Sequence, residues 1–174
     1  MTHSGRRSTR ATAAVVVCAF VLRAAWSAYA ARPPEGLRDP FTYVALARSL
    51  AAGQGYIAPF THTATAYYPP GYPFFIAPLL WLTMHVGSLS SHEPILVALA
   101  NATCWTAAVY LTIRLARLVT NERAALVAGA LVAVWPNSVV GSAVALSEPL
   151  FVALVLAGTV VVLEGRTNIT VVAR

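Results

Sequence analysis

The sequence contains few charged residues. Charged side chains make up 10% of the 174 residues, against roughly 25% in a soluble globular domain. Hydrophobic residues account for 58%, and several apolar runs approach the roughly 20 residues needed to cross a bilayer. The shortage of charge excludes an ordinary soluble domain, and no barrel-like alternation of apolar and polar residues occurs. Because helices satisfy their own backbone hydrogen bonds in lipid, we expect an all-α polytopic membrane protein.

Lysine is absent, and all twelve basic residues are arginine. The arginines lie in small groups beside apolar runs, so the net charge of +6 indicates membrane topology and no nucleic-acid partner. Cysteine is limited to Cys18 and Cys104, both inside predicted spans, which argues against a disulfide scaffold. The histidines have no spacing typical of a metal site. The sequence therefore predicts no definite cofactor and leaves a divalent metal open.

The first apolar run, residues 11–31, follows a basic tail of residues 1–10. Basic flanks remain in the cytoplasm, so we expect a multi-pass cell-membrane protein with a cytoplasmic N-terminus. A cleaved signal peptide is the alternative, because residues 28–30 (Ala-Tyr-Ala) fit a cleavage pattern. The run continues to nearly full spanning length, which favours a retained helix. Arg23, inside this run, should face other helices or extend toward an interface.

A long outer loop, residues 32–93, is expected to hold two short helices. Asp39 as N-cap, followed by proline, predicts the start of the first helix at about 40–52, and Gly53 predicts its end. The second helix is predicted at about 73–86, and the segment between the two helices reads as an irregular loop. The first helix is too short to span a bilayer, so we place it at the membrane surface, whereas the second is marginal for a span.

The next group of arginines distinguishes two topologies. If the second short helix crossed the membrane, Arg114, Arg117 and Arg123 would lie outside; if it stays at the surface, they lie in the cytoplasm with the N-terminal tail. We choose the second arrangement. It predicts one membrane domain, residues 11–174, whose four spans cover about 11–31, 94–119, 124–141 and 150–163.

This topology places two acidic residues on the same outer face. Asp39 is the only aspartate in the chain, and Glu148 directly precedes the last span. An ionisable residue at the edge of an apolar segment indicates a functional site. The structural alternative is that Asp39 only caps its helix and Glu148 only occupies a first helical turn, where negative charge is favoured by roughly 0.3–1 kcal/mol.

Four motifs occur in order along the chain. They are Arg-Asp-Pro-x-x-Tyr at 38–43, Ala-Arg-Ser-Leu-Ala-Ala-Gly-Gln-Gly-Tyr at 47–56, Tyr-Pro-Pro-Gly-Tyr-Pro at 68–73, and Ser-Glu-Pro-Leu-Phe at 147–151. Together they resemble the N-terminal part of a C-type (GT-C) membrane glycosyltransferase. The resemblance is to the group that includes protein O-mannosyltransferases and the bacterial aminoarabinose transferase of lipid A.

The resemblance implies an enzyme that transfers a sugar from polyprenyl phosphate to an acceptor on the outer side of the membrane. It implies Asp39 as the catalytic acid that takes or orients the acceptor's proton, and Glu148 as a second acidic position. Its partners would be membrane lipid and a polyprenyl-phosphate sugar. The candidate substrate-binding residues are Arg38, Tyr43, Tyr56, Tyr67, Tyr68 and Tyr72.

Two features depart from the family pattern. Many relatives carry a second acid directly after the first, where this chain has Pro40, and family members have many more spans. We therefore expect a truncated product or one part of a split enzyme, with a larger membrane subunit as a partner. The alternatives are a non-catalytic module that binds polyprenyl phosphate or a partner subunit, and an unrelated small helical membrane protein.

Overall fold

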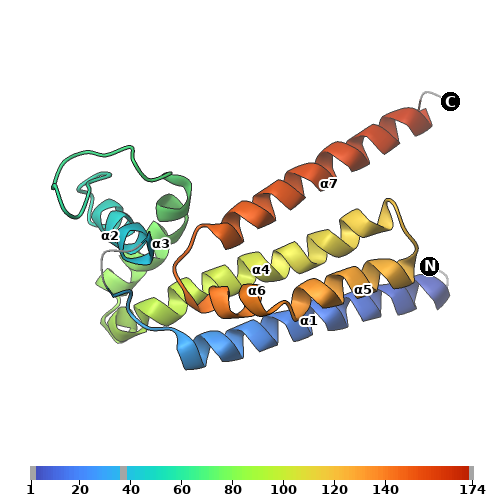
Figure 1. The fold of residues 1–174 in the computed structure, drawn as a ribbon, viewed down its shortest axis with the longest axis horizontal. Helices are drawn as coiled ribbons and strands as arrows, with labels where there is room; N and C mark the ends of the chain where they lie inside the picture. Colours follow the sequence, from blue (N-terminus) through green and yellow to red (C-terminus); the bar gives the residue numbers. More distant parts are fainter. Residues whose placement is uncertain (1–2, 36–38, 173–174) are drawn as a thin grey trace.

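The computed structural model describes the backbone of residues 3–35 and 39–172, and the side chains of residues 7–35 and 39–165. These residues form helices and connecting segments, without a β-strand (Figure 1). The elements are α1 His3–Ala30, α2 Asp39–Ala51, α3 Gly71–His85, the 3₁₀ helix η1 Gly87–His92, α4 Glu93–Arg117, α5 Glu122–Ala133, α6 Pro136–Val140, the 3₁₀ helix η2 Gly141–Ala143, and α7 Glu148–Val172. The predicted all-α class is confirmed.

Three helical segments of the described chain are long and apolar enough to cross a membrane: Arg7–Ala30, Gly87–Arg117 and Glu148–Gly165. A fourth crossing results if the pair Glu122–Ala133 and Pro136–Ala143, bent by 54°, forms one broken span. Helices α2 and α3 are not among these segments. The fold is therefore that of a polytopic helical membrane protein with three or four candidate spans, as predicted.

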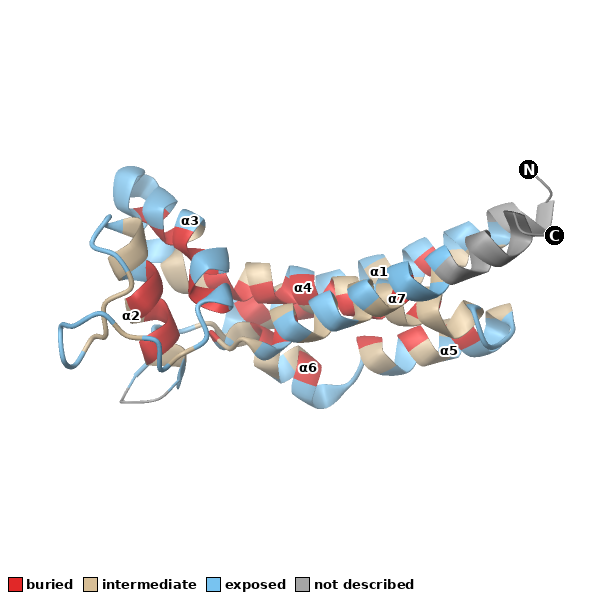
Figure 2. Ribbon diagram, turned by 90° about the horizontal axis from the view of Figure 1, so that it is seen from above, coloured by how far each residue is buried: buried red, intermediate tan, exposed pale blue. Residues whose placement is uncertain are grey.

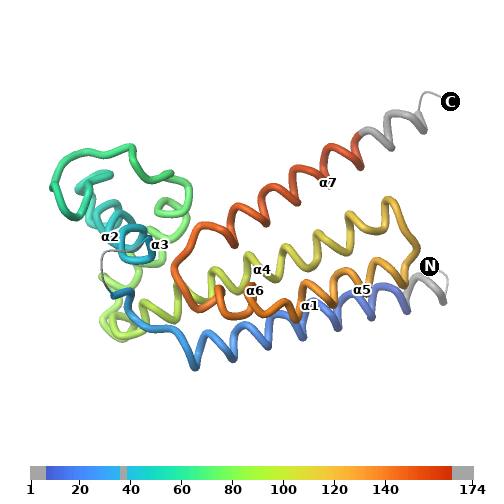
Figure 3. The backbone as a smooth tube through the Cα atoms, viewed as in Figure 1, coloured from blue at the N-terminus to red at the C-terminus, as the bar shows by residue number. Residues whose placement is uncertain are grey.

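Helices α1, α4 and α5 run side by side, and α7 runs along α4 in the same direction, at an angle to it (Figures 1 and 3). We call the end that carries α2, α3 and residues 134–148 the loop end. The opposite end, with residues 7–12 and 114–123, is the terminal end. Arg117 Nη2 donates to Thr12 Oγ1 over 2.6 Å, which fixes the start of α1 beside the end of α4. The N-terminal arginines and those of the α4–α5 turn thus share one end of the bundle.

The expected continuous span at 124–141 is broken in the structure. Helix α5 ends at Ala133 and α6 begins at Pro136. Proline has no N–H to donate, and its ring collides with the carbonyl of the preceding turn, so it interrupts a helix interior. The break leaves backbone carbonyl groups without their usual helical donors.

Arg23 of α1 binds these carbonyl groups. Its Nη1 donates to Ala133 O over 2.9 Å and to Ala19 O over 3.1 Å, and its Nη2 donates to Val132 O over 3.0 Å and to Ser138 Oγ over 2.8 Å. The side chain is 0% exposed. Of the two placements expected for Arg23, the structure shows the one that faces other helices. We call this set of contacts the Arg23 junction.

Helices α4 and α5 approach each other closely just before the break. A Cβ atom added to Gly129 would lie 2.2 Å from Ile113 Cγ1, and Ile113 is fully buried. Only glycine allows this approach without displacing the isoleucine. Small residues of this kind let helix backbones pack tightly in membranes, where water does not drive helices together.

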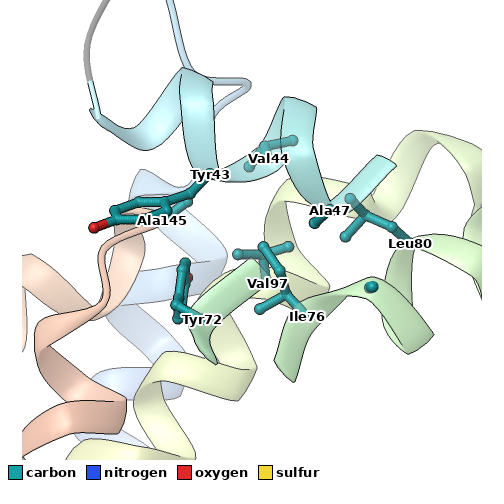
Figure 4. Packing of buried hydrophobic residues seen from close by; sticks show 9 residues of the cluster. Tyr43, Val44, Ala47, Tyr72, Ile76, Leu80, Val97 and Ala145 are labelled. Carbon is teal, nitrogen blue, oxygen red and sulfur yellow. The ribbon is translucent and has the colours of Figure 1, made fainter. Parts of the chain in front are cut away.

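The loop end has its own apolar core, formed where α2 lies against α3 (Figure 4). The buried face of α2 is seen in Figure 2. In α7, by contrast, only 17% of the candidate span Glu148–Gly165 is buried. The core side chains include Tyr43, Val44 and Ala47 from α2 and Tyr72, Ile76 and Leu80 from α3. This packing explains why a helix too short to span the bilayer is stable where it is.

Helix α2 ends in a glycine cap, as predicted. Gly53 has φ +72°, its N–H donates to Leu50 O over 3.0 Å, and the N–H of Gln54 donates to Ser49 O over 3.0 Å. These two bonds define a Schellman motif. The left-handed conformation at its centre favours glycine because other residues carry a Cβ atom.

The segment after the cap is more ordered than the expected irregular loop. Ile57 and Ala64 form an antiparallel bridge, supported by a bond of 2.9 Å from Ala58 N to Thr63 O. His62 lies at the turn with φ +53°. The sequence prediction was incomplete here because a proline inside a short run argues against strand pairing.

Candidate functional site

Asp39 lies at the first residue of α2, at the exposed surface of the loop end. The helix therefore begins one residue earlier than predicted, with Asp39 inside its first turn. The hydroxyl of Tyr68 donates to Asp39 Oδ1 over 2.9 Å. This bond raises the pKa of Tyr68 above its ordinary value, because the carboxylate stabilises the protonated phenol. Asp39 is thus held by a side chain from the tyrosine-proline turn, in addition to any role at the helix terminus.

All five tyrosines predicted to bind substrate are linked by contacts around Tyr68, the hydrogen-bond partner of Asp39. The Tyr43 ring meets Tyr68 and Tyr72 edge-on, with centroids 5.4 and 5.3 Å apart. Tyr67 meets Tyr68 in the same way at 5.3 Å, and the hydroxyl of Tyr56 donates to the Tyr68 carbonyl over 3.0 Å. We call these residues the tyrosine cluster.

The cluster has an exposed part and a buried part. Tyr67 is 85% exposed, whereas Tyr43 and Tyr72 are 7% and 2% exposed. An aromatic ring that stacks on a sugar must be open to solvent, which Tyr67 satisfies. Tyr43 and Tyr72 instead support the site from below, as parts of the core between α2 and α3 (Figure 4).

Glu148 lies at the same end of the bundle as Asp39. It is the first residue of α7 and is exposed. The preceding Ser147 is tied to α2, because its Oγ lies 3.2 Å from the hydroxyl of Tyr43, within hydrogen-bond distance. The structure therefore places both predicted acids around the tyrosine cluster. Arg38, the remaining predicted residue, lies outside the described residues.

A buried polar contact that the sequence analysis did not predict lies beneath the cluster. The hydroxyl of Tyr72 donates to Asn101 Oδ1 over 3.0 Å, and Asn101 Nδ2 donates to the carbonyl of Val144 over 2.6 Å. Burial raises the pKa of Tyr72 far above its ordinary value. An asparagine inside an apolar span was the available signal, because polar residues at membrane depth find partners within the bundle. We call this set of contacts the Asn101 junction.

An ion pair between Arg48 and Glu93 was also missed. Arg48 Nη2 donates to Glu93 Oε1 over 2.6 Å, and its Nε donates to Oε2 over 3.1 Å. This bidentate geometry is the stronger arrangement for an arginine and a carboxylate. It joins α2 to the first turn of α4, so the surface helix is attached to a spanning helix.

A cavity of about 260 Å³ opens beside the start of α2. Its lining includes the apolar residues Val44, Val97 and Ala143 and the charged residues Arg32, Glu35 and Glu93. A lining that combines apolar side chains with a few charged groups is typical of a ligand site. The loop end thus combines an exposed carboxylate, an exposed aromatic ring and a partly apolar cavity.

The described residues contain no group of three or more His, Cys, Asp or Glu side chains placed to hold a metal ion. In the described part of the chain, neither Asp39 nor Glu148 belongs to a group of this kind. The described partner of the Asp39 carboxylate is a phenol, which is suited to orienting a proton acceptor.

Comparison of the chain with protein-family models, with curated proteins and with solved structures gave no match. The resemblance to GT-C glycosyltransferases therefore rests on the order and spacing of the four motifs. A functional inference must rest on the chemistry of the loop end.

Proposed function

We propose that this chain is the part of a membrane glycosyltransferase that carries the catalytic carboxylate, and that it transfers a sugar from a polyprenyl-phosphate donor. The observation that supports this function best is the exposed carboxylate of Asp39, held by the Tyr68 hydroxyl at the edge of the tyrosine cluster. A positioned carboxylate with a free face can accept a proton from a bound acceptor group.

In the proposed reaction the hydroxyl or amino group of the acceptor gives its proton to Asp39 as it attacks the anomeric carbon of the sugar. The bond between that carbon and the phosphate oxygen breaks, and polyprenyl phosphate leaves with the bonding electrons. The hydrogen bond from Tyr68 fixes the carboxylate so that one oxygen faces the acceptor. Glu148 supplies a second acidic group, which would orient the acceptor or the sugar.

The substrate would extend from the tyrosine cluster toward the bilayer. Tyr67 offers the exposed ring for the sugar, and the cavity lined by Arg32 would hold the carrier phosphate. We place the loop end on the extracytoplasmic side, because the terminal end carries the larger number of arginines.

The orientation is tested by labelling with a membrane-impermeant maleimide in a chain whose native cysteines are replaced by alanine. Gln54→Cys at the loop end should react in intact cells. Arg123→Cys at the terminal end should react only after the membrane is made permeable. The opposite pattern would contradict the proposed orientation.

The catalytic role is tested with Asp39→Asn in a membrane transferase assay that supplies labelled polyprenyl-phosphate hexoses and pentoses. Asparagine keeps an oxygen that can accept the Tyr68 hydrogen bond, but it cannot take a proton from the acceptor. We expect a loss of about 10²- to 10⁴-fold in turnover with little change in folding.

Glu164→Gln is the matched control, because it makes the same chemical change at the terminal end. It should retain most of the wild-type rate. A wild-type rate in Asp39→Asn, or an equal loss in both variants, would contradict the proposed role of Asp39.

A second candidate function is that of a non-catalytic module that packs against a larger membrane subunit. The observation that favours it is the exposed apolar face of α7, where only 17% of the candidate span is buried. Purification of the tagged chain from its native membrane distinguishes the two. A stoichiometric large membrane subunit, together with no transfer by the chain alone, would favour this candidate.

A further inference from the structure

A second cavity lies at the terminal end, far from the loop-end site. Its volume is about 540 Å³, and it is lined by the first turns of α1 and the last turns of α4. Ser8, Thr12 and Arg117 line the part nearest the helix ends, and Ala13 and Val16 line the part deeper in the bundle. From Ser8 to Val16 the cavity covers about 12 Å along the helix axis. It therefore changes from polar to apolar along the direction of the spans.

Two arginines of α4 provide charge at this cavity. Arg114 pairs with Glu164 and also donates to the hydroxyl of Tyr110 over 2.9 Å. Arg117 pairs with Glu122 and also donates to the hydroxyls of Thr12 and Ser8. A guanidinium group has five N–H donors, more than one carboxylate accepts. Both arginines are therefore able to keep their glutamates and bind a further anion.

The charge of the whole terminal end favours an anionic ligand. Its described side chains include five arginines and two glutamates: Arg7, Arg10, Arg114, Arg117, Arg123, Glu122 and Glu164. Arginine is well suited to phosphate, because its planar fork matches two phosphate oxygens at once. The excess of positive charge is not neutralised by the two ion pairs.

The surroundings of the cavity favour a lipid over a soluble anion. The cavity is lined by the ends of the candidate spans Arg7–Ala30 and Gly87–Arg117, so in a bilayer it would lie near the level where hydrocarbon meets headgroups. Nearby apolar side chains are open to the bilayer: Val17 and Val21 are 59% and 58% exposed. A ligand seated here needs a charged group at the helix ends and a hydrocarbon part beside α1.

We propose that this cavity binds the headgroup of an anionic phospholipid. The phosphodiester would accept hydrogen bonds from the N–H groups of Arg114 and Arg117 that their glutamates leave free. Its acyl chains would follow Val16 and the exposed valines of α1 toward the middle of the bilayer. This site is independent of the proposed glycosyl transfer, since it lies at the opposite end of the bundle.

The test measures binding of fluorescent phosphatidylglycerol to the purified full chain in detergent, with phosphatidylcholine of the same acyl chains as the neutral comparison. Phosphatidylglycerol should bind at least fivefold more tightly. Arg114→Gln should weaken its binding about fivefold, as expected for one arginine near an anionic headgroup. Arg123→Gln, which removes the same charge at the same end but outside the cavity, should change binding less than twofold.

Three outcomes would overturn the proposal. They are equal binding of the two lipids, equal losses in Arg114→Gln and Arg123→Gln, and displacement of phosphatidylglycerol by inorganic phosphate at the concentration of the lipid. The last outcome would identify a site for a free anion. If Arg114→Gln does not fold, a photoreactive phosphatidylglycerol on the wild-type chain replaces it. Labelling within residues 8–16 and 110–117 supports the site, and labelling elsewhere overturns it.

Discussion

Two buried polar junctions hold the broken segment of the bundle, and they differ in charge and in what lies beside them. The Arg23 junction places a cation on the carbonyls of Val132 and Ala133, between α1 and α5. The Asn101 junction places a neutral amide between the carbonyl of Val144 and the hydroxyl of Tyr72. The first connects spanning helices only to one another. The second connects a spanning helix to the tyrosine cluster.

The difference shows how a helix break can serve two purposes. Backbone carbonyls at membrane depth need hydrogen-bond donors, and a side chain adds donors at each end of the broken segment. Arginine supplies several donors at the sharp bend before Pro136. Asparagine supplies a donor and an acceptor, so it can satisfy the backbone and hold a tyrosine at the same time. The two junctions should therefore respond differently to mutation, in size and in effect on the site.

The largest effect is expected from Arg23→Leu. The substitution removes four hydrogen bonds, among them the one that the carbonyl of Ala133 accepts at the break, which should cost about 2–4 kcal/mol of stability. Helical content during titration from mild detergent into SDS measures the loss. Arg23→Lys should lose less, because an ammonium group still reaches some of the carbonyls.

Pro136→Ala sharpens this result, because it restores an N–H at the break. In that background Arg23→Leu should cost less than in the wild type, since the helix can satisfy more of its own carbonyls. If the stability changes of Arg23→Leu and Pro136→Ala simply add in the double variant, Arg23 does not compensate for Pro136. Unchanged stability in Arg23→Leu alone would show that other groups satisfy the break.

An intermediate effect is expected from Asn101→Leu. It leaves the buried hydroxyl of Tyr72 without its Asn101 partner, at a cost of about 1–3 kcal/mol, while the carbonyl of Val144 keeps its bond from the N–H of Leu146. Unlike Arg23→Leu, it should also disturb the tyrosine cluster, so proteolysis of the loop end should become faster at a given global stability. Limited proteolysis of the folded variants in detergent measures that difference.

Tyr72→Phe/Asn101→Leu separates the two contributions. Removing both polar partners leaves no orphaned phenol, so the double variant should be no less stable than Asn101→Leu alone. An additive loss would indicate that the two residues act separately, and the Asn101 junction would not be a unit.

The smallest effect concerns pH. Burial raises the pKa of Tyr72 in the folded chain above its value of about 10 in the unfolded chain. The folded state therefore holds this proton at pH values where the unfolded state has released it. Stability from this group is complete below about pH 10 and decreases above it.

Unfolding midpoints between pH 8 and 11 test this sign. Tyr72→Phe should lose less stability over that range than the wild type. Tyr29→Phe, which removes an exposed tyrosine, is the comparison for the loss of one phenol. An equal alkaline loss in the wild type and Tyr72→Phe would exclude Tyr72 as the source.

Much of the fold could be predicted from local patterns. The apolar runs predicted the long helices, and Gly53 predicted the end of α2 because its left-handed backbone is a local property. The break between Ala133 and Pro136 was not predicted, although proline is a helix breaker. An apolar run tolerates a proline when other helices satisfy the freed carbonyls, and that depends on Arg23, more than a hundred residues earlier in the chain.

The sequence predicted which residues form the candidate site better than it predicted what each of them does there. The two acids and the tyrosines stand out because polar and aromatic residues are informative beside apolar runs. Their division into an exposed Tyr67 and a buried Tyr43 and Tyr72 depends on how α2 lies against α3. Asn101 and Glu93 were missed because their partners, Tyr72 and Arg48, are distant in the sequence.

The sequence by itself determined the apolar composition of this protein, its helical class and the glycine cap that ends α2. These follow from composition and short-range patterns that act through each residue's own backbone. The tertiary structure alone decided which polar groups meet: Tyr68 with Asp39, Arg23 with a broken helix, and Asn101 with both backbone and tyrosine. The physical reason is that a buried polar group must find its partner in space, and the chain brings those partners together only when the helices pack.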